Sequence, residues 1–229
     1  ADSVVTFKYA VRSIAKRFGM HATFMPKPKE GVAGSGMHLN ISVYKDGRNI
    51  FNIDSLDQKI GDEARWFIGG ILSHVKEICA ISNPLVNSYK RLLTGFEAPR
   101  DIIWTTQNKN ALVKVHKRVG EDSKVELRFP DPSANPYLVL AMCLAAGMEG
   151  IIEKTEPGEQ APMCYESEAP ENLPDNLREA VLYMKNSTFA GKVLGKEFRD
   201  IYTEIKTREW NDYMIQVSDW EIKKYLVRV

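Results

Sequence analysis

Three polar side chains follow a glycine-rich turn at a spacing that could place them together. His38, Asn40 and Ser42 alternate with apolar residues, which is the period of a half-buried β-strand, so they should project from one face. The turn GVAGSG before them carries glycines whose backbone can approach a ligand closely, because Gly34 and Gly36 have no Cβ. A strand histidine could bind a metal ion, although such a residue taken alone is more often structural.

A carboxylate and a guanidinium share one face of a second short stretch. Glu126 and Arg128 alternate with Val125, Leu127 and Phe129 just before the segment PDPSANPY. An exposed strand face with an ion pair is the plain interpretation. The apolar neighbours and the long apolar segment that follows indicate an interior strand instead, where an unpaired charge is costly. We therefore expect these charges to meet a metal ion or an ionic ligand.

A third candidate is the loop that begins at Lys90 and Arg91. Gly95 and Pro99 frame Glu97 in the segment LLTGFEAP, and this composition predicts a loop. By composition alone, a surface loop with scattered charges is the better interpretation of Glu97.

The elements that must position these residues alternate between extended and helical patterns. Apolar spacing predicts helices at residues 2–18, 60–82 and 136–153, and a mostly helical chain after the Pro- and Glu-rich loop at 156–176. Extended stretches are predicted at 21–25, at 37–51 as a hairpin turning at Asp46 and Gly47, and at 102–106, 111–115 and 125–129. The sequence thus predicts one α+β unit, with an antiparallel sheet backed by helices and a helical carboxy-terminal tail.

Composition excludes several classes of function. The 31 basic and 30 acidic side chains give a net charge of +1, so no overall field favours nucleic acid or an anionic membrane. Three widely spaced cysteines predict reduced thiols in a cytoplasmic protein, with Cys79 and Cys143 in the core. No apolar run approaches the length of a membrane span, and the first residues do not form a signal peptide.

Several segments together resemble one enzyme family. The segments ATFMPKP, GSGMHLNIS, NPLVNSYKRLLTGFEAP and VELRFPDPSANPY resemble, in order and spacing, the signature segments of glutamine synthetases of the bacterial type I-like form. The ending, with NLREA and then WNDYMIQVSDWEIKKYL, is similar to the same family, so the resemblance covers nearly the whole chain. It implies the open antiparallel half-barrel of that family's catalytic domain, with a β-rich core at about residues 20–130 and a helical part at 136–229.

The resemblance implies ATP-dependent ligation of ammonia to L-glutamate through a γ-glutamyl phosphate, with Mg²⁺ or Mn²⁺. It assigns His38 and Glu126 as metal ligands and Glu97, Arg91 and Arg128 as catalytic residues. The implied substrate-binding residues are Gly34, Arg91, Glu97, Lys109 and Arg128, and the implied ATP-binding residues are Asn40, Ser42, Lys114 and Lys124.

Three departures from the family pattern leave alternatives open. Ala33 stands where the family usually has an asparagine, and Lys109 and Lys114 stand where it usually has phosphate-facing arginines. Lysine keeps the charge but lacks the bidentate fork of arginine. A γ-glutamyl-amine ligase, or a non-catalytic regulatory or structural module, would therefore also fit the sequence.

The chain opens without Met and directly into a helical pattern, so we expect an excised piece of a longer protein. The family's small amino-terminal domain and its other metal-binding carboxylates would lie upstream. On this interpretation the chain alone is inactive, and the complete protein forms a dodecamer-like ring of identical subunits.

Overall fold

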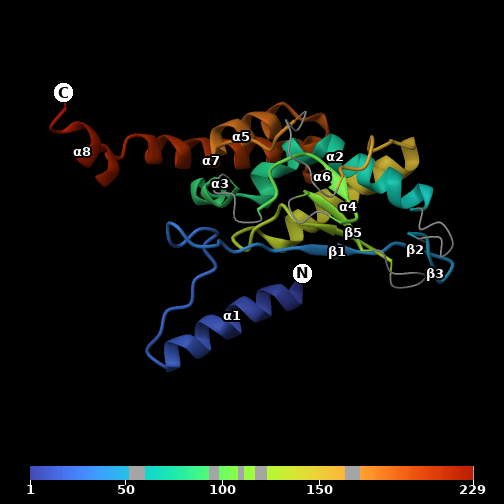
Figure 1. The fold of residues 1–229 in the computed structure, drawn as a ribbon, viewed down its shortest axis with the longest axis horizontal. Coiled ribbons are helices and arrows are strands. Elements are labelled where there is room, and N and C mark those ends of the chain that lie inside the picture. Colours follow the sequence, from blue (N-terminus) through green and yellow to red (C-terminus); the bar gives the residue numbers. More distant parts are fainter. Residues whose placement is uncertain (52–59, 93–97, 108–110, 117–122, 163–170, 229) are drawn as a thin grey trace.

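The α+β architecture predicted from the sequence is confirmed by a computed structural model. It describes residues 1–228 except 52–59, 93–97, 108–110, 117–122 and 163–170. Figure 1 shows a small open sheet with helices packed along one side. The helices are α1 (Asp2–Arg17), α2 (Asp62–Ser82), α3 (Val86–Leu92), α4 (Pro136–Glu153), α5 (Leu177–Asn186), α6 (Thr188–Leu194), α7 (Lys196–Met214) and α8 (Asp219–Tyr225). The strands are β1 (Leu39–Ile41), β2 (Tyr44–Lys45), β3 (Arg48–Asn49), β4 (Trp104–Thr105), β5 (Val113–His116) and β6 (Lys124–Leu127).

The main sheet has the strand order β1-β6-β5-β4. Strand β6 pairs antiparallel with both β1 and β5, as expected, but β4 pairs parallel with β5. The prediction that every strand would be antiparallel is wrong at this edge. The pairing of β4 involves only two residue pairs, Trp104 with Val113 and Thr105 with Lys114, and a residue pattern that alternates between faces carries no information on strand direction.

The predicted hairpin at 37–51 is correct in its turn and wrong in its partners. Asp46 and Gly47 both have positive φ, 51° and 77°, and join β2 to β3 in a tight turn. Strand β1 instead pairs with β6, from Leu39 opposite Leu127 to Ile41 opposite Val125. Strand β1 therefore forms its backbone hydrogen bonds with β6, which is distant in the sequence, and not with the neighbouring strand of the predicted hairpin.

The stretch at 21–25 is not a strand, contrary to prediction. It runs as irregular chain between α1 and the glycine segment. A strand needs a hydrogen-bonded neighbour, and within the described residues no strand pairs with it.

The core lies between the apolar face of the sheet and helices α2 and α4. These two helices approach so closely that a Cβ added to Gly70 would lie 2.1 Å from the carbonyl oxygen of Ala146. The predicted helix at 136–153 matches α4 at both ends; Asn135 caps it by accepting a hydrogen bond from the Tyr137 amide. Cys79 and Cys143 are fully buried free thiols in this core, as predicted.

The expectation that no apolar run approaches the length of a membrane span is wrong for helix α4 by length and composition. Of the described helices it alone has the length and mean hydropathy, 1.4, of a candidate membrane span, and 39% of it is buried. A core helix gives the same signal, and α4 packs along α2.

Two helices at the ends of the chain lie apart from this core. Helix α1 contains no buried residue and lies beside the sheet in Figure 1, tied down at the Ala134 carbonyl by Lys8 Nζ at 3.3 Å. Helix α8 follows α7 away from the body, and none of its residues is buried.

Candidate active site

The register of the sheet gathers polar side chains on the face opposite the helical core. Asn40 and Lys114 both lie opposite Glu126, on the strands to either side of it, while Lys124 lies opposite His116. The other face carries the apolar partners, such as Leu39, which pack on the core. Because alternate residues of a strand face the same way, one polar surface forms across β1, β6 and β5.

Glu126 is the centre of this surface. Its Oε1 lies 2.8 Å from Nδ1 of His38 and 3.2 Å from a terminal nitrogen of Arg128, and its Oε2 lies 2.8 Å from Nε2 of His116. These contacts hold the carboxylate in place at both of its oxygens, and the Glu126 side chain is only 9% exposed.

The charges around Glu126 decide its ionisation. Burial alone would raise the pKa of Glu126, but the Arg128 charge, a hydrogen bond from His116 and the His38 charge together lower it below its usual value. Burial, followed by the positive charge of Arg128, lowers the pKa of His38, against the opposing effect of Glu126. The lowered pKa values favour an ionised carboxylate beside an uncharged imidazole.

Arg91 lies beneath the glycine segment. Its terminal nitrogens donate to the carbonyls of Phe129 at 3.0 Å and Arg128 at 3.2 Å, and the residue is only 5% exposed. A Cβ at Gly36 would lie 2.7 Å from an Arg91 nitrogen and 3.2 Å from His38 Nε2. A Cβ at Gly34 would lie 2.5 Å from the Pro26 carbonyl oxygen and 3.1 Å from Cγ of Arg91. Both glycines are thus required by close packing around Arg91, whatever they do for a ligand.

Two asparagines of the segment NPLVNSYKRLLTGFEAP hold this arrangement. Asn87 accepts from the Lys27 amide at 2.7 Å and donates to the Lys27 carbonyl at 3.0 Å, which fixes the chain entering the glycine segment. The fully buried Asn83 donates to the Phe129 carbonyl at 2.9 Å and, at 3.4 Å, to Asp131. The segments resembling the family therefore meet in space and position one another.

The predicted residues divide into three groups. His38, Glu126, Arg128 and Arg91 lie together, with Gly34 packed on Arg91. Asn40, Lys114 and Lys124 lie along the same polar face, and Ser42 donates to the Ser123 carbonyl at 2.9 Å. Glu97 and Lys109 fall outside the described residues.

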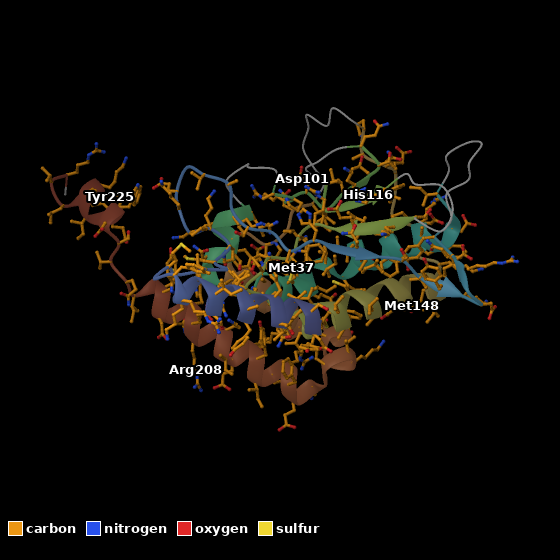
Figure 2. The ribbon with its side chains drawn as sticks, turned by 90° about the horizontal axis from the view of Figure 1, so that it is seen from below. Met37, Asp101, His116, Met148, Arg208 and Tyr225 are labelled. Carbon is orange, nitrogen blue, oxygen red and sulfur yellow. The ribbon has the colours of Figure 1, made fainter. Side chains whose placement is uncertain are left out.

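Sequence reasoning missed His116. Figure 2 shows it on the side of the molecule opposite Arg208 of α7. The available signal was the alternation in VKVH, which places Lys114 and His116 on one face. Without the pairing of β5 with β6, that alternation could not connect His116 to Glu126.

His38 and Glu126 have the chemistry and spacing of two ligands of one divalent cation. Two ligands each about 2.1 Å from an octahedral ion, at a right angle, lie about 3.0 Å apart. The separation between Nδ1 of His38 and Oε1 of Glu126 is 2.8 Å. Within the part of the chain that the structure describes, no group of three or more such ligand residues is arranged around one point. These residues fit a divalent cation as a partial ligand set.

Comparison with known proteins decides the family. The sequence-family model described as the glutamine synthetase catalytic domain matches residues 1–225 of this chain. The chain belongs to the glutamine synthetase family. It is 47% identical to the glutamine synthetase of Clostridium saccharobutylicum and 44% identical to that of Methanosarcina mazei, over 99% of this chain in both cases. A solved structure of apo GmaS matches with a TM-score of 0.87, 35% identity and 99% coverage of this chain.

The glutamine synthetase relatives are longer than this chain. The chain covers 53% of the Clostridium protein, 52% of the Methanosarcina protein and 53% of the apo GmaS chain. It thus spans about half the length of the relatives it matches, and these come from both bacteria and archaea.

Proposed function

We propose that this chain is the carboxy-terminal part of the catalytic domain of an ATP-dependent glutamate–ammonia ligase, which forms L-glutamine through γ-glutamyl phosphate. The observation that carries this proposal is the Glu126 cluster, which sits on the family's signature segments and joins a metal-ligand pair to an arginine. The coverage of about half of each relative supports a division of the active site between this chain and a further segment.

His38 and Glu126 would hold Mg²⁺ or Mn²⁺. A divalent cation bound there would neutralise phosphate oxygens and stabilise the charge that develops during phosphoryl transfer. The lowered pKa of Glu126 favours its ionised form and the lowered pKa of His38 favours its uncharged form, which are the forms in which carboxylate and imidazole bind a cation.

Arg128 would bind an anionic substrate. Its Nε is buried and has no hydrogen-bond partner among the described residues, although another of its nitrogens contacts Glu126. A buried donor without an acceptor is costly, and an oxygen of glutamate or of its phosphate would satisfy it. Arg91, with its nitrogens on backbone carbonyls, would act mainly by shaping the floor on which Gly34 approaches the substrate.

ATP would lie along the polar face of the sheet. Asn40, Lys114 and Lys124 share this face with Glu126, and lysine ammonium groups suit phosphate oxygens as point charges. Ser42 would contribute at the far end of β1, and Lys109 would meet the transferred phosphate. Glu97 would close over the site and accept a proton from ammonium.

For the complete protein we propose a cytoplasmic homo-oligomer, a dodecamer-like ring of the bacterial type I-like form. Neither nucleic acid nor a membrane would be a partner. The near-neutral net charge of +1 supports the absence of such partners.

A γ-glutamyl-amine ligase is the second candidate. Lys114, at the position where the family usually has an arginine, lies directly opposite Glu126 in the sheet, so the change falls inside the site. The match to solved GmaS structures, at 35% identity, is compatible with this alternative. The greater identity to proteins named glutamine synthetase, 47% and 44%, favours ammonia as the acceptor.

The test is γ-glutamyl hydroxamate formation by the full-length protein. We expect activity in the wild type and its loss in Glu126→Ala, because that change removes a ligand and releases His38 and Arg128 together. Comparing ammonia, putrescine and ethylamine as acceptors distinguishes the two ligases. An inactive wild type would favour the non-catalytic module, and equal activity in the variant would contradict the role proposed for Glu126.

A further inference from the structure

We propose that His116 is a positioning residue that orients the Glu126 carboxylate for metal binding, a role that the family resemblance does not assign. The inference rests on the proposed function of His38 and Glu126 as metal ligands. His116 ends strand β5 and reaches diagonally across to β6, where Lys124 rather than Glu126 is its direct partner. Its Nε2 lies 2.8 Å from Oε2 of Glu126.

The two oxygens of Glu126 have different neighbours. Oε1 faces His38 and Arg128. On this side of the carboxylate we place the cation and the anionic substrate. Among the described residues, His116 alone makes a hydrogen bond to Oε2. An ionised carboxylate is only an acceptor, so the His116 nitrogen that faces it must carry the proton and donate.

A donor on Oε2 fixes the rotation of the carboxylate about its last torsion. That torsion is broad and two-fold for glutamate, so the preference must come from the surroundings. When Oε2 is held by His116, Oε1 is the oxygen presented to His38, at a separation suited to two ligands of one ion. Hydrogen bonds of this kind to ligating carboxylates orient the ligand and raise metal affinity.

The same geometry argues against His116 as a ligand of that cation. Its Nε2 lies at the opposite oxygen of the carboxylate from Nδ1 of His38. An ion placed between His38 and Oε1 would lie on the other side of the carboxylate from His116. His116 therefore acts on the metal through Glu126.

The experiment measures Mn²⁺ binding to the full-length protein, by the electron paramagnetic resonance signal of free Mn²⁺, with no turnover required. Four variants are compared with the wild type: His116→Ala, His116→Gln, Glu126→Ala and His21→Ala. Glutamine places an amide N–H near the position of the imidazole Nε2, so it can keep the donor. His21 is an exposed histidine that is distant in the sequence from His116, and it serves as the matched control. Circular dichroism melting checks that each variant is folded.

We expect His116→Ala to weaken Mn²⁺ binding by about 10- to 100-fold. His116→Gln should recover most of that loss, and His21→Ala should bind like the wild type. Pulsed resonance spectra should show the same nitrogen coupling to bound Mn²⁺ in the wild type and in His116→Gln, because the coupled nitrogen belongs to His38.

Two results would overturn the positioning role while leaving the proposed function intact. One is wild-type affinity in His116→Ala when Glu126→Ala is weakened. The other is loss of nitrogen coupling in His116→Gln together with affinity as low as that of His116→Ala, which would make His116 a ligand. Wild-type affinity in Glu126→Ala would refute the metal pair itself, and with it the proposed function.

Discussion

Replacing Arg91 by lysine tests whether this residue holds the site together through the backbone. In the structure, one terminal nitrogen of Arg91 donates to the Phe129 carbonyl at 3.0 Å and the other donates to the Arg128 carbonyl at 3.2 Å. A third carbonyl, of Pro130, lies at 3.5 Å, too far to contribute much. A lysine ammonium keeps the charge, but a single nitrogen cannot occupy both positions of the fork.

The expected loss follows from those two bonds. If the ammonium retains one of them, one hydrogen bond from a charged donor disappears, which costs about 1.5–3 kcal/mol. The Phe129 carbonyl would keep its hydrogen bond from Asn83, so the change removes one charged donor from buried chain without leaving this carbonyl unpaired. Local opening of residues 126–131 should then become about 10- to 150-fold more frequent, since each 1.4 kcal/mol is a factor of ten.

Native-state hydrogen exchange measures this directly. The Arg128 amide donates to the Leu112 carbonyl at 3.0 Å and the Asp131 amide to the Ser82 carbonyl at 3.1 Å, so both report opening of this segment. Arg208→Lys is the control, because Arg208 is an exposed helix residue paired with Glu204 and lies on the far side of the molecule in Figure 2. Unchanged exchange at both amides in Arg91→Lys would show that Arg91 does not support the site through these carbonyls.

Two further predictions concern the helical layer. Gly70→Ala should lower the free energy of unfolding by about 1–3 kcal/mol, seen as a lower thermal midpoint, because the new Cβ would lie 2.1 Å from the Ala146 carbonyl oxygen. Glu77 should support the fold only above acidic pH: burial alone would raise its pKa, but His74, whose Nδ1 lies 3.5 Å from Oε1, and a hydrogen bond from Ser187 lower it below the usual 4.5. Its stabilising contribution is therefore present above pH 4.5 and is lost as the pH falls through the lower, folded-state pKa, so Glu77→Gln should flatten the acid side of the profile of thermal midpoint against pH.

Each of these has a matched control. Gly191→Ala adds the same methyl group where the nearest atom is 3.2 Å away, on the flexible side chain of Arg199, so it should change the midpoint little. Equal midpoints for the two alanine variants would contradict the close packing of α2 on α4. For Glu77, the control is Glu204→Gln, on an exposed helix surface. A wild-type acid profile in Glu77→Gln would show that another group governs acid stability.

The sequence by itself determined the features that depend on local pattern. The 3.6-residue spacing and the Asn135–Pro136 start gave both ends of α4. Two-residue alternation gave the strand around Asn40, although β1 itself is only Leu39–Ile41, so that His38 and Ser42 flank it. Asp46 and Gly47 specified their turn because it requires positive φ at both positions, which these two residue types tolerate. These features depend on residues that are close together in the sequence, so the sequence alone is enough to predict them.

Only the tertiary structure decided which strands are neighbours, and the site depends on that. The alternation of residues in VKVH and KVEL is the same whether β5 and β6 pair or lie apart. Nor does such alternation indicate that β4 runs parallel to β5. Pairing brought His116 to Glu126, and packing on Arg91 explained Gly36, which the sequence suggested only as a ligand approach. The physical reason is that contacts between distant segments are set by the shared burial of apolar faces, and many registers of a short strand satisfy the same local pattern.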